Sequence, residues 1–235
     1  MSARHRALER ATARANSAYN GGPLPCFGRR AIPWEVEEPM SLTQRSREII
    51  VGSLLGDACL ERNGKNVRLR IDHGRQQEAF VNWKFQELSE LGPSTPKRLE
   101  VFDSRTNQTY IHYRFSSRTT EVLNEFFESF YDDHGVKRIP PSIDAYPNSA
   151  LSIAVWYMDD GGRRGDCRSG YLNTQAYRAE EVEILRDCLL RKFAIPTRTH
   201  FAAGRPRIYI ASADFEQFCS WIRPYVIPEM QYKLL

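Results

Sequence analysis

The sequence contains two nine-residue stretches of one kind, IVGSLLGDA at residues 50–58 and IAVWYMDDG at residues 153–161. Each is an apolar run of helical character that ends on a carboxylate, Asp57 in the first and Asp160 in the second. The carbonyl end of a helix carries partial negative charge, so an acid placed there needs a compensating cation. Two such acids, one in each stretch, predict a metal site formed by paired carboxylates.

The spacing of the two motif acids predicts a chain built from two similar halves. They lie 103 positions apart in 235 residues, and units of about 100 residues have the usual size of a compact domain. We expect a first repeat over residues 41–146 and a second over residues 147–235. Residues 1–40 are punctuated by glycine and proline without periodicity, so we expect an N-terminal extension outside the repeats.

Hydrophobic periodicity predicts the same order of elements in both halves. The first half reads as a helix to Asp57, a strand around residues 67–72, a helix over 78–91, a strand over 110–115 and a helix over 122–130. The second half reads as a helix to Asp160, a strand over 171–175, a helix over 180–193, a strand over 207–210 and a helix over 215–222. Thr43 or Ser41, and Asn148 or Ser149, are the expected helix caps. This order indicates duplication of one α/β unit, with room for further strands in the linking segments.

The polar faces of the predicted strands are unusual in composition. A solvated face normally mixes lysine, glutamate and serine, whereas these faces carry arginine, tyrosine and histidine. Such side chains suit DNA phosphates and base edges, although an ordinary solvated face is the alternative. The candidate DNA-binding residues are Arg68, Arg70, Tyr110, His112, Arg114, Tyr171, Asn173, Arg207 and Tyr209.

Composition narrows the class of protein and its setting. Of the 33 basic residues, 27 are arginine, which suits nucleic acid; codon bias in a GC-rich genome explains this equally well and favours a bacterial source. No apolar run approaches the ~20 residues of a membrane span. The five cysteines form no C-x-x-C pair, so neither a zinc site nor a disulfide framework is indicated. We expect an intracellular protein of the bacterial cytoplasm or nucleoid. An organelle is the alternative, because the arginine-rich start faintly resembles a transit peptide.

Three further segments, WYMDDGG at 156–162, YLNTQAY at 171–177 and PYVIPEMQYKL at 224–234, carry a family resemblance together with the two motifs. They resemble the single-chain, two-motif branch of the LAGLIDADG homing endonucleases over residues 42–235. The resemblance implies an α/β (α+β) fold of tandem, pseudo-twofold αββαββα repeats, with two saddle-shaped antiparallel sheets over the DNA major groove. The motif helices would pack at the axis, where Gly52, Ser53, Gly56 and Ala154 are small enough for close approach.

The resemblance also implies a reaction. A monomer would hydrolyse both strands of a long, asymmetric double-stranded DNA site and leave short 3′ overhangs. Asp57 and Asp160 would hold Mg²⁺, with Mn²⁺ able to substitute, and the backbone carbonyls of Gly56 and Asp159 would add ligands.

The family pattern places one basic residue per half near the scissile phosphate. Lys137, in VKRIP, and Lys233, in QYKL, match these positions in a chain with only six lysines. Each could stabilise charge on the phosphoryl group or organise the attacking water. An exposed surface lysine is the alternative, above all for Lys137, because Arg138 adjoins it.

A polar residue of the family that positions solvent is matched by Gln175. His73 is predicted as its counterpart in the first repeat, because each lies seven residues before a helix core position, Phe80 and Val182. His73 departs from a glutamine-type residue, and a surface histidine at a strand end is the alternative reading. Ala58 is a second departure, since the motif has glycine there.

The leading prediction is an intron-encoded, site-specific DNA endonuclease. A maturase that binds intron RNA on the same fold would need neither acid. A catalytically silent DNA-binding regulator would be expected to lose acids or lysines, and this chain keeps all four. An unrelated two-repeat α/β protein is a more distant alternative, and an intein would need splicing sequence for which the chain lacks room.

Overall fold

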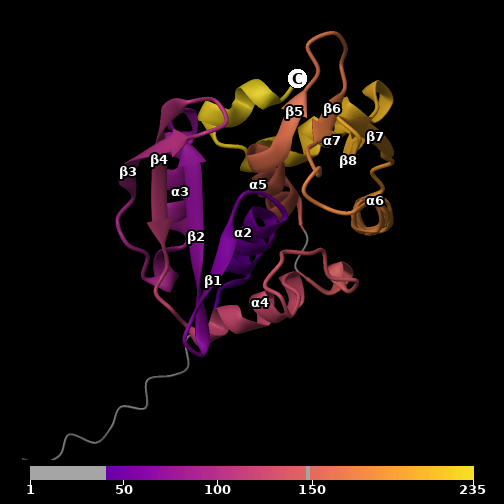
Figure 1. Cartoon of the computed structure of the whole chain (residues 1–235). Coiled ribbons are helices and arrows are strands. Elements are labelled where there is room, and N and C mark those ends of the chain that lie inside the picture. The colour runs from indigo at the N-terminus through magenta and orange to yellow at the C-terminus, as the bar shows by residue number, and fades with distance from the viewer. Residues whose placement is uncertain (1–40, 147–148) are drawn as a thin grey trace, which may run out of the picture. The chain divides into compact units, whose positions relative to one another are not determined.

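The computed structural model describes residues 41–146 and 149–235 of the chain (Figure 1). The predicted extension at residues 1–40 and the candidate cap Asn148 lie outside the described residues. The elements of the first repeat are α2 (Gln44–Leu55), β1 (Cys59–Asn63), β2 (Asn66–Gly74), α3 (Glu78–Glu87), β3 (Lys97–Asp103), β4 (Gln108–Ser116) and α4 (Asn124–Phe130). Those of the second are α5 (Ala150–Asp160), β5 (Gly161–Arg163), β6 (Gly170–Leu172), α6 (Ala179–Phe193), β7 (Arg198–Ala202), β8 (Arg205–Ile210) and α7 (Ser212–Ile222). The tandem αββαββα order is confirmed.

Each repeat contains one four-stranded antiparallel sheet. The strand orders are β1-β2-β4-β3 and β5-β6-β8-β7, so the two sheets have the same topology. The inner strands β2, β4, β6 and β8 were predicted from alternating hydrophobicity. The outer strands β1, β3, β5 and β7 were not, because an edge strand buries few side chains and shows little alternation.

The motif helices α2 and α5 lie side by side between the two sheets (Figure 1). Thr43 caps α2 by accepting the N–H of Ser46, and Ser149 caps α5 by accepting the N–H of Leu151. The Ser149 hydroxyl also donates to Glu48 of α2. Both helices are therefore started by side chains that the sequence predicts as caps.

The first motif helix ends earlier than predicted. It stops at Leu55, two residues before Asp57, because Gly56 leaves the helical region at φ −102° and ψ −134°. The N–H of Ala58 then turns back to the carbonyl of Ser53 at 3.0 Å. The predicted strand over residues 171–175 is likewise shorter and ends at Leu172. The helix predicted over 78–91 ends at Glu87 and continues as a short 3₁₀ turn, Ser89–Leu91.

Glycine permits backbone contact between the motif helices. A Cβ atom on Gly52 would lie 2.3 Å from the carbonyl oxygen of Ser152 and 2.8 Å from the Cβ of Val155. A Cβ on Gly56 would lie 2.5 Å from the Cβ of Asp159. The absence of a side chain at these two glycines lets the helices touch. The contact at Gly56 brings their C-terminal ends together.

This contact predicts the effect of one added methyl group. Gly52→Ala should lower the free energy of unfolding by about 1–3 kcal/mol, since overpacking forces the helices apart. In an open helix the same substitution would stabilise by about 1 kcal/mol. Urea denaturation measures the change. Gly74→Ala is the matched control, because a Cβ there meets nothing within 4 Å. A Gly52→Ala protein as stable as wild type would contradict close packing.

Candidate active site and nucleic-acid interface

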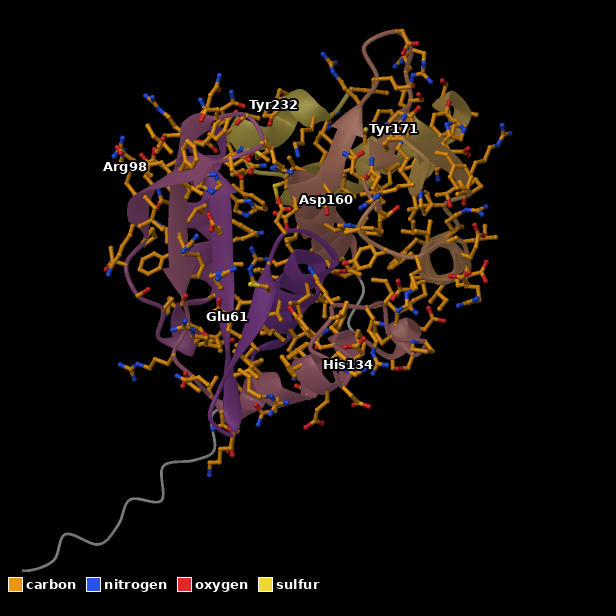
Figure 2. All side chains as sticks on the ribbon, in the orientation of Figure 1. Glu61, Arg98, His134, Asp160, Tyr171 and Tyr232 are labelled. Carbon is orange, nitrogen blue, oxygen red and sulfur yellow. The ribbon has the colours of Figure 1, made fainter. Side chains whose placement is uncertain are left out.

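The two motif acids meet at one pocket. Asp57 and Asp160 both line a cavity of about 450 Å³, together with Lys137, Asn173 and Gln175. Asp57 is 47% exposed and Asp160 is half-buried. Figure 2 shows Asp160 between the two sheets. The predicted juxtaposition of one acid from each repeat is therefore present.

The charges at this pocket suit a divalent cation. Burial, followed by the charges of Asp57 and Asp159, raises the pKa of Asp160 to about 8. Contact with His73 instead lowers the pKa of Asp57. Crowded carboxylates at helix C-termini repel one another, and hard oxygen ligands of this kind are those that Mg²⁺ binds. Of the three neighbouring acids, Asp57 and Asp160 reach the pocket, whereas the Asp159 side chain is 0% exposed.

A lysine side chain binds the backbone carbonyls at the C-terminal end of each motif helix. Lys137 Nζ donates to the carbonyls of Gly56 at 2.6 Å and Ala58 at 2.9 Å. Lys233 Nζ donates to those of Met158 at 2.5 Å and Asp159 at 3.1 Å. These ammonium groups stabilise the negative ends of the helices. The two carbonyls predicted as metal ligands, those of Gly56 and Asp159, thus already accept lysine hydrogen bonds.

The lysines also lie against the opposite repeat. Lys137 faces the strand end of repeat two at Asn173 and Gln175. Lys233 and Tyr232 line a second cavity of about 480 Å³ with residues 74–77, 109–112 of repeat one, including Tyr110 and His112. In Figure 1 the yellow C-terminal segment lies beside the upper ends of β2 and β4, and Figure 2 labels Tyr232 there. Burial lowers the pKa of Lys137 to about 8 and also lowers that of Lys233.

The predicted equivalence of His73 and Gln175 is wrong by one residue. Strand pairing sets Arg70 opposite Cys59 and Tyr171 opposite Gly162, two residues after each motif acid. Helices α3 and α6 then begin at corresponding positions, Glu78 and Ala179. Counted on this register, His73 corresponds to Thr174, and Gln175 corresponds to Gly74.

The error arose because helices α3 and α6 were aligned one residue out of register. Val81, and not Phe80, is the counterpart of Val182. Both Phe80 and Val81 are fully buried, so periodicity alone could not choose between them.

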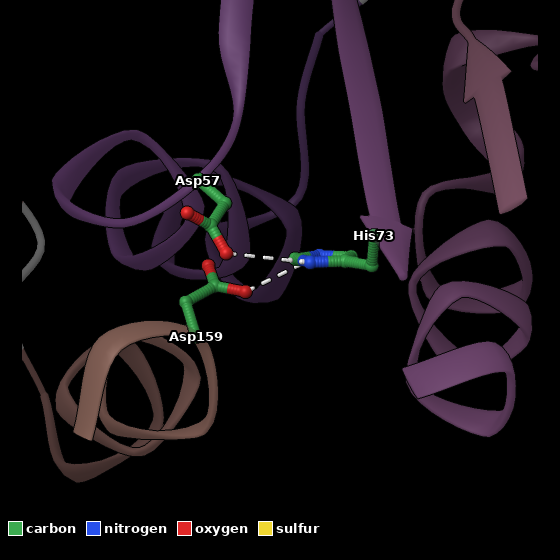
Figure 3. A group of neighbouring side chains, drawn as sticks. All are labelled: Asp57, His73 and Asp159. Carbon is green, nitrogen blue, oxygen red and sulfur yellow. Dashed lines mark ion pairs between the residues drawn. The ribbon is translucent and has the colours of Figure 1, made fainter. Parts of the chain in front are cut away.

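His73 is also buried rather than exposed at a strand end. Its side chain is 1% exposed and lies between two acids (Figure 3). Nε2 lies 3.3 Å from Asp159 Oδ1, and Nδ1 lies 3.4 Å from Asp57 Oδ2. Lys84, 0% exposed, donates to both Asp159 carboxylate oxygens at 2.8 and 3.0 Å. The surface reading of His73 is therefore excluded.

Sequence reasoning missed Lys84. A charged residue in an amphipathic helix is normally assigned to the solvent face. The available signal was its spacing, since Lys84 follows the buried Val81 by three residues and precedes the buried Leu88 by four. This spacing places it on the core face of α3, where a buried charge requires a partner.

On sheet one the predicted DNA-binding arginines are held by acids. Arg68 and Arg70 both pair with Glu61 of β1. Arg114 and His112 of β4 both pair with Asp72 of β2. Glu61 and Asp72 were not predicted, yet they share the face of their partners through the strand register. This face therefore presents oriented guanidinium groups with part of their charge neutralised.

On sheet two the corresponding face is aromatic. The Arg207 guanidinium lies 3.5 Å from the centroid of the Tyr171 ring, and His200 stacks on Tyr209 at 4.0 Å. His200 was missed because β7 was not predicted. Burial, and then the charge of Arg207, lower the pKa of His200. Asn173 lies beyond the end of β6, and its amide donates to the Asp160 carbonyl at 2.8 Å, so the structure places it at the motif helix and not on a strand face.

Comparisons with known proteins define the family. The model of the LAGLIDADG DNA endonuclease family matches residues 47–218, and the chain belongs to this family. The probable intron-encoded endonuclease 1 of Wickerhamomyces canadensis is 30% identical over 200 residues, which cover 83% of this chain and 86% of that protein. The cytochrome b mRNA maturase bI2 of Debaryomyces hansenii is also 30% identical over 200 residues, covering 82% and 74%.

A solved structure agrees with the fold. The homing endonuclease I-WcaI, bound to its DNA recognition sequence, superimposes with a TM-score of 0.75 at 29% identity, over 84% of this chain and 88% of that one. The fold predicted from the motifs is confirmed. Within the described residues, every helix is too short or too polar to cross a membrane.

The buried ion pair generates a stability prediction. Lys84→Leu should lower the free energy of unfolding by about 3–5 kcal/mol, because it leaves the Asp159 charge buried without a partner. Adding Asp159→Gly should recover at least half of this loss. A double-mutant cycle by urea denaturation measures the coupling. Arg45→Leu, which removes an exposed pair with Glu87, is the control and should cost less than about 1 kcal/mol. Losses from Lys84→Leu and Asp159→Gly that simply add would contradict the assignment.

Proposed function

We propose that this chain is a site-specific homing endonuclease, encoded within an intron, that hydrolyses both strands of a long double-stranded DNA target. The observation that carries the proposal is the pair of motif helix ends, where each repeat supplies one motif acid to a shared pocket and a half-buried lysine binds the carbonyls at each end. Membership of a DNA endonuclease family supports it. So does the position of the pocket between two sheets whose polar faces carry arginine, histidine and tyrosine.

Asp57 and Asp160 are the residues that we propose to hold divalent metal, with Mg²⁺ as the natural ion and Mn²⁺ as a substitute. The two carboxylates fit, since both reach the pocket. The backbone carbonyls of Gly56 and Asp159 accept lysine hydrogen bonds, so we propose that they join the metal only when those lysines turn toward phosphate. Bound metal would supply a more acidic water and stabilise charge on the leaving oxygen.

The lysines have a separate role in this proposal. Lys137 and Lys233 hold ammonium groups against the helix ends, where they can donate to phosphoryl oxygens as charge develops. Gln175 lines the same pocket as Lys137, and we propose that it orients solvent there. His73 acts from inside the fold through Asp57. Cleavage by two such half-sites leaves short 3′ overhangs.

Recognition of the target is proposed to be asymmetric. Sheet one offers Arg68, Arg70 and Arg114 paired with acids, whereas sheet two offers Arg207 with aromatic rings. Two unlike faces suit a target without twofold symmetry, read by base contacts together with DNA shape. One chain carries both motif acids, so we propose that it acts as a monomer whose repeats span residues 41–146 and 147–235.

A maturase that binds intron RNA is the second candidate function. The similarity to a cytochrome b mRNA maturase supports it, and neither motif acid is needed for RNA binding. We propose an intracellular site of action, because intron DNA and its transcript are there. The sequence favours bacterial cytoplasm, whereas relatives from two yeasts make an organelle the alternative.

Cleavage of the host gene's intronless insertion site tests the proposal. Double-strand cutting should occur in Mg²⁺ or Mn²⁺ and stop in EDTA. Asp57→Asn and Asp160→Asn should each reduce the rate by at least about 100-fold while DNA binding in Ca²⁺ persists, because losing one metal-ion interaction removes several kcal/mol of charge stabilisation. Asp187→Asn, an exposed acid on α6, is the matched control and should cut like wild type. Tight binding without cutting in either metal would reject the nuclease and favour the maturase.

A further inference from the structure

Three of the positions at which the repeats differ meet at one place. Repeat one has Gly56 where repeat two has Asp159. Repeat two has Thr174 and Leu185 where repeat one has His73 and Lys84. The exchanged residues His73, Lys84 and Asp159 form one buried cluster beside Asp57 (Figure 3).

Asp159 joins the cluster by crossing into repeat one. It belongs to α5, but its Cβ packs where a side chain on Gly56 would stand. Its carboxylate is bound there by Lys84 of α3. Both side chains are 0% exposed. A buried charge pair of this kind holds one geometry, because separating the charges leaves each without water.

The Lys84–Asp159 pair fixes the imidazole of His73. Nε2 of His73 lies 3.3 Å from Asp159 Oδ1 and 3.4 Å from Lys84 Nζ, and the ring packs against Phe80 with centroids 5.5 Å apart. The other nitrogen, Nδ1, is buried and points at Asp57. Nδ1 makes no well-formed hydrogen bond to any residue that the structure describes, so Asp57 is its available partner.

A metal held by Asp57, His73 and Asp159 is the competing interpretation of this cluster, because their ligand atoms lie within 4.8 Å of one another. The Lys84 ammonium already supplies the cation to Asp159. Lysine at 2.8 Å would repel a metal on the same carboxylate. The cluster is therefore better described as a buried Lys84–Asp159 ion pair with His73 packed beside it.

Repeat two contains no counterpart to this cluster in its described residues. Thr174, at the position of His73, donates its hydroxyl to the Pro206 carbonyl at 3.3 Å, away from Asp160. Leu185, at the position of Lys84, is an ordinary buried apolar side chain. The two motif acids thus have different supports.

We infer that His73, clamped by the buried Lys84–Asp159 pair, is a positioning residue for Asp57 alone, so that the two target strands are cut by non-equivalent half-sites at different rates. This inference rests on the proposed nuclease function. It assigns to Lys84, Asp159 and His73 a role in the order of strand cutting.

Single-turnover cleavage of a target with a different fluorophore on each strand tests the inference. His73→Thr, the residue of repeat two, should slow one strand at least tenfold and leave the other within threefold, with DNA affinity in Ca²⁺ unchanged, so that nicked DNA accumulates. His73→Gln, which can still reach Asp57 with a donor, should restore most of the lost rate. Lys84→Leu combined with Asp159→Gly should slow the same strand, because His73 loses its clamp.

The outcomes separate this inference from the function on which it rests. Absence of cutting by wild type would reject the nuclease itself. Wild-type cutting with both strands slowed equally by His73→Thr, or neither slowed, would overturn the positioning role. A merely structural role would lower the unfolding midpoint and affect both strands alike, and Gln would not rescue it.

Discussion

Backbone contact between helices α2 and α5 is the constraint on which the site depends. Gly52 and Gly56 leave no room for a side chain against Ser152, Val155 and Asp159, so the two helix ends cannot separate without losing buried contact. This closeness forces two acids toward one pocket at the negative ends of two helices, which is unfavourable without cations. Lys137 and Lys233 offset part of that cost at the carbonyls, and we propose that a metal bound by the open carboxylates offsets the rest.

Pseudo-twofold symmetry governs the architecture but not the chemistry around each acid. The sheets share one strand order, and each lysine meets the strand end of the opposite repeat. At equivalent positions, repeat one has the buried ammonium of Lys84 and the imidazole of His73, whereas repeat two has Leu185 and Thr174. The same divergence appears on the polar faces of the sheets, where acids pair with the arginines of one sheet and an aromatic ring packs against Arg207 of the other. An asymmetric DNA target matches both differences.

The sequence predicted what depends on local pattern. Motif helices, inner strands, Thr43 and Ser149 as caps, and the meeting of Asp57 with Asp160 all follow from periodicity, capping and the family motifs. The edge strands were not predicted because they bury few apolar side chains. The roles of Lys84, Glu61 and Asp72 were not predicted because they depend on partners elsewhere in the chain, such as Asp159, which lies 75 positions from Lys84. His73 was identified as a candidate, but its equivalence to Thr174 became clear only from the strand pairing, and its burial only from the packing around it.

We propose that the open acids Asp57 and Asp160 bind the metal while Asp159 stays paired with Lys84. Anomalous diffraction from a crystal of the protein with its DNA target and Mn²⁺ would locate the metal. We predict manganese signal at the carboxylates of Asp57 and Asp160, with Lys84 Nζ still hydrogen-bonded to Asp159 and no metal on His73. Manganese coordinated by His73 and the Asp159 carboxylate, with Lys84 displaced, would show instead that the buried cluster is the metal site.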